Sequence, residues 1–184
     1  MNKEYLALLR GINVGGNNII KMADLKVSFE KMGFAKVKTY IQSGNVLFET
    51  ECLEQELEAK IEKQLSKDFN YKSTVVIISA NVFKDMVRQA PKTFGTQPEK
   101  YKYDYIFLKS PLTAKEALTH VSLRDGVDTA KAGSGVLYFS RLTSQLSKSH
   151  LSKIIKSPIY SRITIRNWNT TTKLCTLLES RQDD

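Results

Sequence analysis

The order of predicted strands and helices occurs twice along this chain, and that repetition restricts the fold more than any other feature. The first half reads strand, helix, strand, strand, helix, strand. Its most clearly marked element is a helix over residues 53–69, where an apolar side chain recurs at every fourth position. The other first-half elements are strands at 5–9, 36–41, 45–48 and 73–79 and a helix at 22–32 that ends before Gly33.

The same order begins again after residue 100. Strands are predicted at 103–108, 127–131, 136–139 and 162–166, and helices at 113–121 and 146–155. The turn and strand Ser-Gly-Asn-Val-Leu-Phe at 43–48 is matched by Ser-Gly-Val-Leu-Tyr at 134–138, one residue out of register. We therefore predict an α+β protein built from a duplicated β-α-β-β-α-β unit.

Two further helices and a linker complete the predicted organisation. A linking helix over 82–90 can be capped by Ser79 or Asn81 and stops at Pro91. A C-terminal helix can be capped by Asn169 or Thr170. The predicted domains are residues 1–90 and 102–184, joined by a proline-containing linker over 91–101.

The positive charge of the chain is concentrated in one segment. The formal net charge is +9, from 28 basic and 19 acidic residues. No acidic residue occurs between Asp128 and Glu179, a segment that contains Lys131, Arg141, Lys148, Lys153, Lys156, Arg162, Arg166 and Lys173. Such asymmetry is typical of a surface that meets phosphates or another polyanion, and the alternative is a solvated basic face.

Composition excludes several other classes of protein. Cys52 and Cys175 have no CxxC spacing and no neighbouring histidine, so neither a disulfide framework nor a zinc site is expected. The N-terminal apolar run ends at Arg10 and is too short for a signal peptide, and no apolar stretch reaches the length of a membrane span. We expect a soluble cytoplasmic protein that does not enter membranes.

A loop rich in glycine and asparagine at 11–18 joins the first strand to the first helix and is the leading candidate site. It lacks both the Gly-Lys-Ser/Thr ending of a Walker A loop and the GxGxxG spacing. Glycines can still let backbone amides approach an anion. The alternative is a connection whose glycines only satisfy turn geometry. The candidate ligand-binding residues are Arg10, Asn13, Gly15, Gly16, Asn17 and Lys21.

Two other polar segments are candidate sites. The hairpin turn offers Gln42, Ser43 and Asn45. A tight turn without a ligand is the favoured interpretation of these residues, and the position of the turn relative to the first loop stays open. The segment 166–170 combines a guanidinium, the only tryptophan, amides and hydroxyls before a helix. The alternative is a capped helix whose tryptophan fills a gap. Its candidate ligand-binding residues are Arg166, Trp168, Asn169 and Thr170.

Residues for acid–base, nucleophilic or metal chemistry are sparse. His120 and His150 are the only histidines, and neither stands at a spacing that marks a triad or metal site. Asp125 and Asp128 flank Gly126, where a turn with side-chain hydrogen bonds is favoured over a cation site. We expect no metal and no cofactor, and the catalytic residues, if any, stay unassigned.

Three segments together resemble a known family. They are Ala7 to Gly16 (ALLRGINVGG), Thr39 to Phe48 (TYIQSGNVLF) and Thr164 to Thr170 (TIRNWNT). The chain resembles an uncharacterised bacterial family catalogued as a domain of unknown function (number 1697), which is identified by its LLRGINVGG, TYIQSGNV and RNWNT segments. The resemblance spans essentially the whole chain and implies two ferredoxin-like halves. It implies no reaction or ligand, so no site residue is carried over from it.

Three functional hypotheses follow. The first is an anion-binding module for nucleic acid or nucleotides, which uses the basic segment and the aromatic residues Tyr138, Phe139, Tyr160 and Trp168. The second is an enzyme or sensor for a small anionic metabolite such as a phosphorylated molecule, held by Arg10, Arg166 and the amides near Asn169. The third is a protein-interaction scaffold without a small ligand.

Overall fold

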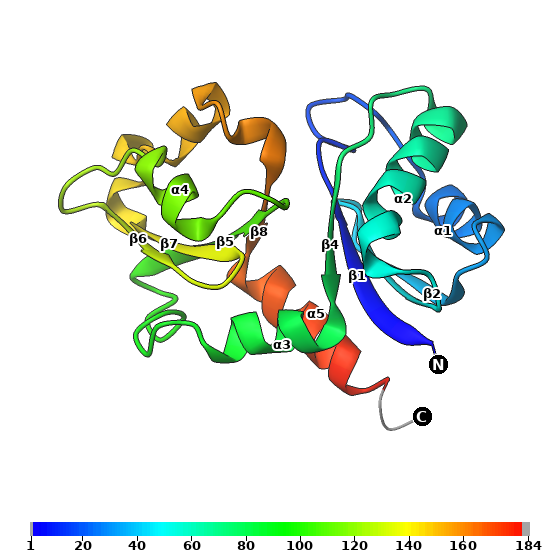
Figure 1. Ribbon diagram of the computed structural model, residues 1–184. Coiled ribbons are helices and arrows are strands. Elements are labelled where there is room, and N and C mark those ends of the chain that lie inside the picture. The colour runs from blue at the N-terminus through cyan, green and yellow to red at the C-terminus, as the bar shows by residue number, and fades with distance from the viewer. Residues whose placement is uncertain (1, 182–184) are drawn as a thin grey trace. The chain divides into compact units, whose positions relative to one another are not determined.

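Two four-stranded antiparallel sheets form the frame of the protein (Figure 1). The computed structural model describes residues 2–181 and divides into two units, one up to Phe83 and one from Lys84 onward. None of the helices within residues 2–181 has the length and apolar character needed to cross a bilayer. The boundary between the units falls inside helix α3 (Ala80–Arg88).

The first unit has the predicted element order. It contains β1 (Lys3–Leu9), α1 (Met22–Lys31), β2 (Ala35–Tyr40), β3 (Asn45–Thr50), α2 (Glu54–Phe69) and β4 (Val75–Ser79), with strand order β2-β3-β1-β4. Figure 1 shows α1 and α2 on the same face of this sheet. Alternate β1 side chains point to that face because a strand has a period of two residues, so Tyr5, Ala7 and Leu9 join the core with Phe29 and Ile61.

The second unit repeats the topology. It contains β5 (Tyr101–Leu108), α4 (Ala114–Thr119), β6 (Asp128–Ala132), β7 (Val136–Leu142) and β8 (Ile163–Asn167), with strand order β6-β7-β5-β8. Each strand therefore occupies the place of its counterpart in the first sheet. The α+β fold of two ferredoxin-like subdomains is confirmed.

The predicted helix over 146–155 is wrong. Three short 3₁₀ segments occupy this region instead: η1 (Thr143–Lys148), η2 (Leu151–Lys156) and η3 (Tyr160–Arg162). Ser149 is extended, with φ −61° and ψ 142°, and the His150 N–H donates to Oδ2 of Asp128 at 2.8 Å. A continuous helix would direct that N–H to a carbonyl, whereas serines and the buried Asp128 offer competing partners.

The start of the last helix also differs from the prediction. Helix α5 (Trp168–Glu179) is capped by Asn167, not by Asn169 or Thr170. Asn167 is extended, with ψ 164°, and its Oδ1 accepts from the Thr170 N–H at 2.8 Å. The cap is thus the last residue of β8, so strand and helix join without an intervening loop.

Residues 91–100 lie in the second unit. The Phe94 ring packs edge-on against Tyr103, Tyr105 and Tyr138, with centroid distances of 4.9, 5.1 and 5.5 Å. These tyrosines occupy the sheet face opposite the core of Ile106, Leu137 and Phe139. The segment therefore covers one face of the second sheet.

Candidate functional site

A pocket of about 420 Å³ opens at one end of the second sheet, and we call it the β5–α5 pocket. Antiparallel pairing places the start of β5 beside the end of β8, with Asp104 opposite Asn167. The last residues of β7 and the first turn of α5 reach the same end of the sheet. The lining residues are Pro98, Tyr101, Lys102, Tyr103, Asp104, Arg141, Leu146, Asn167, Trp168 and Asn169.

An ion pair forms one wall of the pocket. Nη2 of Arg141 donates to Oδ2 of Asp104 at 2.7 Å. The Asp104 side chain is 8% exposed and that of Arg141 is 25% exposed. Burial raises the pKa of Asp104 above its ordinary value, while the charge and hydrogen bond of Arg141 act in the opposite direction. Both charges are largely desolvated, so each depends on the other.

Trp168 is held at the pocket by a glycine. A Cβ atom at Gly95 would lie 2.8 Å from Cε2 of the indole, and Gly95 has φ +84°. Only glycine fits both the space and the backbone conformation at this position. The indole is half-buried and lines the pocket together with Tyr101 and Tyr103. Aromatic rings on this wall can stack with a planar ligand.

The other residues predicted in segment 166–170 lie in different environments. Asn169 is exposed and lines the pocket. Thr170 is buried, and its N–H donates to the Asn167 cap. Arg166 is 7% exposed and donates from Nη1 to Oγ1 of Thr164 and to the carbonyl of Ile165, both at 2.9 Å. Desolvation lowers the pKa of Arg166 to about 10.

In the first unit, the loop over 11–18 folds back on itself. Gly15 and Gly16, with φ +59° and +78°, form its tip, and a bridge joins Val14 to Asn17. Asn13 closes the base: its Oδ1 accepts from the Ile20 N–H at 2.8 Å and its Nδ2 donates to the Ile20 carbonyl at 3.0 Å. Two of the loop's asparagines are structural, since Asn18 Nδ2 also donates to the Gly11 carbonyl at 2.9 Å.

The hairpin turn lies at the same edge of the first sheet as this loop. The sequence alone does not decide between this edge and the opposite one. Nδ2 of Asn13 donates to the Gln42 carbonyl at 2.8 Å, and the Leu9 N–H donates to the Gly44 carbonyl at 2.8 Å. Asn45 is fully buried and donates to the Tyr40 carbonyl at 2.9 Å and to Oγ of Ser43 at 3.1 Å. Arg10 is half-buried, whereas Asn17, Lys21 and Gln42 are exposed.

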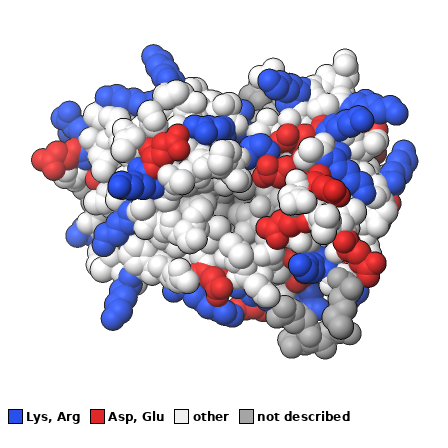
Figure 2. Space-filling model, in the orientation of Figure 1, with Lys and Arg blue, Asp and Glu red and all other residues white. Residues whose placement is uncertain are grey.

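The basic segment between Asp128 and Glu179 does not place all its charges at the surface. Arg141 pairs with Asp104, Arg162 pairs with Glu116 at 3.1 Å, and Arg166 is buried. The lysines of this segment are exposed. On the face that Figure 2 shows, basic side chains stand among acidic ones and form no continuous patch.

A serine, a histidine and a lysine meet at the 3₁₀ segments. Nδ1 of His150 lies 3.0 Å from Oγ of Ser122, and Nε2 lies 2.9 Å from Nζ of Lys153. An ammonium can only donate, so it fixes Nε2 as acceptor and leaves the ring proton on Nδ1, directed at Ser122. A histidine in that tautomer cannot accept the serine proton. Within residues 2–181 no group of three or more metal-ligating side chains is found.

Sequence reasoning missed most of the β5–α5 pocket. The sequence predicts Asp104 only as part of the strand at 103–108 and Arg141 only as one of the basic residues. Tyr101 ends the predicted linker, and Lys102 falls in no predicted element. A signal was present in Tyr-Lys-Tyr-Asp-Tyr at 101–105, because an alternating strand with a lysine and an aspartate on its core face is unusual. The pairing of β5 with β8 was needed to bring this run to Trp168.

The fold and the comparisons with known proteins agree. The two units define a duplicated ferredoxin-like α+β protein. The chain belongs to the family described as "Protein of unknown function (DUF1697)", whose model matches residues 1–138. It is similar to the structure of conserved bacterial protein SP0830 from Streptococcus pneumoniae, with a TM-score of 0.84 and 27% identity over 97% of this chain and 99% of that chain. Comparison with the curated proteins finds no significant match.

Proposed function

We propose that this protein is an anion-binding module for a nucleotide, either free or within a nucleic-acid strand, and that the β5–α5 pocket holds it. The observation that carries the proposal is that aromatic and cationic side chains line one pocket at the start of a capped helix. A volume of about 420 Å³ lies within the common range for small-molecule sites, roughly 300–1,000 Å³.

Each part of a nucleotide has a matching group in the pocket. Trp168 and Tyr101, which are both partly exposed, offer ring faces for a base. The exposed ammonium of Lys102 and the N-terminal end of α5 favour a phosphate. Asn169 adds an amide that can donate to a sugar or phosphate oxygen.

The loop over 11–18 is proposed as a second anion contact. Its tip glycines are exposed, and Lys21 is exposed at the start of α1. Because Asn13 and Asn18 hold the base of the loop, tip amides can meet an anion without refolding. A Lys21→Ala variant tests this contact separately from the pocket: it should weaken anion binding at the loop and leave mononucleotide binding at the pocket unaffected.

Fluorescence of Trp168, the only tryptophan, tests the proposal. We would titrate nucleoside monophosphates, ribose 5-phosphate and a short single-stranded RNA at low and high salt. Nucleotides should give a saturable change, and RNA affinity should fall steeply with salt. Ribose 5-phosphate binding as tightly as the nucleotides would favour the small-metabolite hypothesis, and no response to any of these ligands would contradict the proposal.

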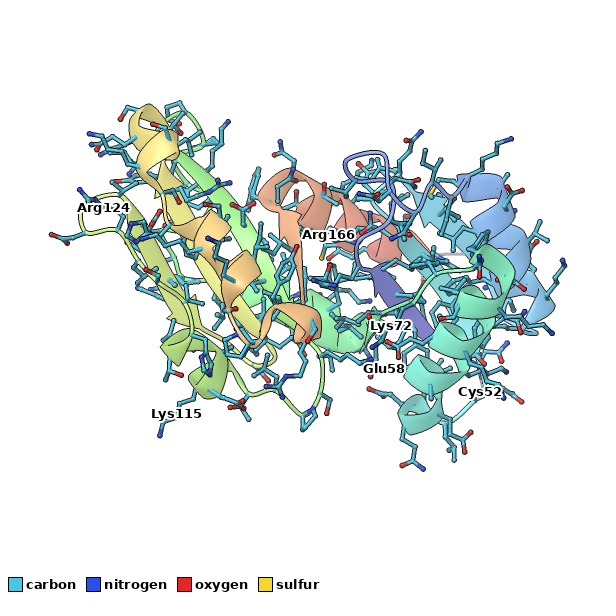
Figure 3. All side chains as sticks on the ribbon, turned by 90° about the horizontal axis from the view of Figure 1, so that it is seen from above. Cys52, Glu58, Lys72, Lys115, Arg124 and Arg166 are labelled. Atoms are coloured by element: carbon cyan, nitrogen blue, oxygen red, sulfur yellow. The ribbon has the colours of Figure 1, made fainter. Side chains whose placement is uncertain are left out.

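Lys102→Ala tests the proposed phosphate contact in the pocket, and Lys115→Ala is its control. Both lysines are exposed in the second unit, but Lys115 lies on α4, outside the pocket, with its side chain pointing outward (Figure 3). Losing one exposed charge contact should weaken nucleotide binding about fivefold. The Lys115 variant should bind as the unmodified protein does.

A further inference from the structure

The β5–α5 pocket contains a carboxylate, and a carboxylate is an unexpected group in a site for an anionic ligand. Asp104 lines the pocket beside Lys102 and Arg141. A carboxylate repels phosphate and attracts hydrogen-bond donors, so Asp104 must face another part of the ligand. A nucleotide bears hydrogen-bond donors on its ribose hydroxyls and on the edge of its base, and a base edge can set two donors in one plane beside an acceptor.

The ion pair leaves hydrogen-bonding capacity on both partners. Arg141 donates one bond, from Nη2 to Oδ2 of Asp104, and no other side chain among residues 2–181 bonds to this carboxylate. An ionised carboxylate has about four lone-pair positions and a guanidinium has five N–H donors. The pair can therefore offer a ligand one donor from Arg141 and the two carboxylate oxygens of Asp104 as acceptors.

We infer that Asp104 and Arg141 select a guanine base, an inference that rests on the proposed nucleotide-binding function. Along one edge guanine carries the O6 acceptor, the N1–H donor and the 2-amino donor. The two donors match the two oxygens of Asp104, and O6 matches Arg141. The base would stack in the space lined by Trp168.

The other bases fit this array less well. Adenine and cytosine each place a ring acceptor beside the amino donor, so one carboxylate oxygen would face a lone pair. Uracil has one N–H between two carbonyl groups. In a desolvated site an unmatched acceptor is costly, so the structure favours guanine by at least about tenfold.

A panel of monophosphates tests the inference in the unmodified protein. GMP should bind at least about tenfold more tightly than AMP, CMP and UMP. IMP, which lacks the 2-amino group, should fall between GMP and UMP. Equal affinities for GMP, IMP and AMP would overturn the inference and leave the proposed function standing, whereas no binding of any nucleotide would overturn both.

Asp104→Asn provides the complementary test. The amide replaces one acceptor with a donor and therefore matches the C2 carbonyl of xanthine better than the amino group of guanine. The variant should shift preference from GMP toward XMP, a gain that damage to the fold cannot produce. Unchanged preference for GMP in a folded variant would also overturn the inference. If the variant does not fold, the affinities of the unmodified protein for the monophosphates are sufficient to test the inference.

Discussion

Arg141 on β7 reaches diagonally across the second sheet to Asp104 on β5, and their 2.7 Å contact joins two strands where the sheet ends. The pair is buried on the same side of the sheet as the core of Ile106 and Phe139. Removing one member of such a pair leaves an uncompensated buried charge.

Arg141→Ala should therefore lower the free energy of unfolding of the second unit by about 3–5 kcal/mol at neutral pH. Denaturant titration followed by Trp168 fluorescence measures this unit directly. The double variant Asp104→Asn with Arg141→Met should recover part of the loss, because no buried charge remains. A double variant as unstable as Arg141→Ala would contradict the explanation.

The loss of stability caused by Arg141→Ala should depend on pH. Burial already raises the pKa of Asp104 above 3.8, and loss of Arg141 removes the influence that lowers it. A folded state that retains the proton longer than the unfolded state loses stability as pH rises through the window between the two pKa values. The stability gap between Arg141→Ala and the unmodified protein should thus narrow on acidification toward pH 4 and widen toward pH 7.

Gly44→Ala should destabilise the first unit more than Gly16→Ala does. Both glycines have positive φ, +77° and +78°, so both substitutions incur backbone strain of about 1–2 kcal/mol. At Gly44 the new Cβ would also lie 2.6 Å from Cδ1 of Ile12 and 2.8 Å from Cβ of Leu9, whereas nothing lies within 4 Å at Gly16. Overpacking adds about 1–3 kcal/mol. Hydrogen exchange at the Leu9 amide, which bonds to the Gly44 carbonyl, reports the difference.

Tyr138→Phe should cost the second unit about 1–3 kcal/mol. The hydroxyl of this buried tyrosine donates to the Met86 carbonyl at 2.7 Å, so the phenylalanine variant keeps the ring packing and leaves that carbonyl without its donor. Tyr40→Phe is the control, because the Tyr40 side chain is partly exposed. Equal stability of the two variants by calorimetry would show that the Met86 bond contributes nothing.

The two thiols should differ in their rate of alkylation. A hydrogen bond with the Thr50 side chain and the Lys60 ammonium, 3.4 Å from Sγ, hold the pKa of Cys52 below its ordinary value despite some desolvation. Burial raises the pKa of Cys175. Because the thiolate is the reactive form, iodoacetamide at neutral pH should modify Cys52 first. Cys52→Ser should then leave one slow site, and fast modification of that variant would contradict the assignment.

The sequence predicted elements well where a local pattern and the tertiary environment favour the same structure. The four-residue repeat of Leu57, Ile61 and Leu65 gave α2, and the turn at Gly44 gave the hairpin. Around Ser149 the same kind of pattern led to a wrong prediction, the helix over 146–155. There the apolar spacing indicates a helix, but the buried Asp128 carboxylate takes a backbone N–H, and only the tertiary fold reveals this competition.

The candidate site was predicted in part for the same reason. Trp168 and Asn169 stand out in the sequence because a lone tryptophan beside amides is locally unusual. Asp104 and Arg141 are 37 residues apart, and strand register alone makes them neighbours. The burial of Arg166 could not be predicted from the sequence either, because a basic residue near the start of a helix normally lies on a solvated surface.

Because the base of the loop over 11–18 is closed by hydrogen bonds, its tip should tolerate an inserted peptide. Asn13 and Asn18 fasten both arms of the loop below the Gly15–Gly16 turn, and none of the hydrogen bonds described for these two side chains involves the tip. A peptide epitope or a fluorescent reporter inserted between the two glycines would project from an anchored stem, which gives this protein a labelling position outside its sheets and cores.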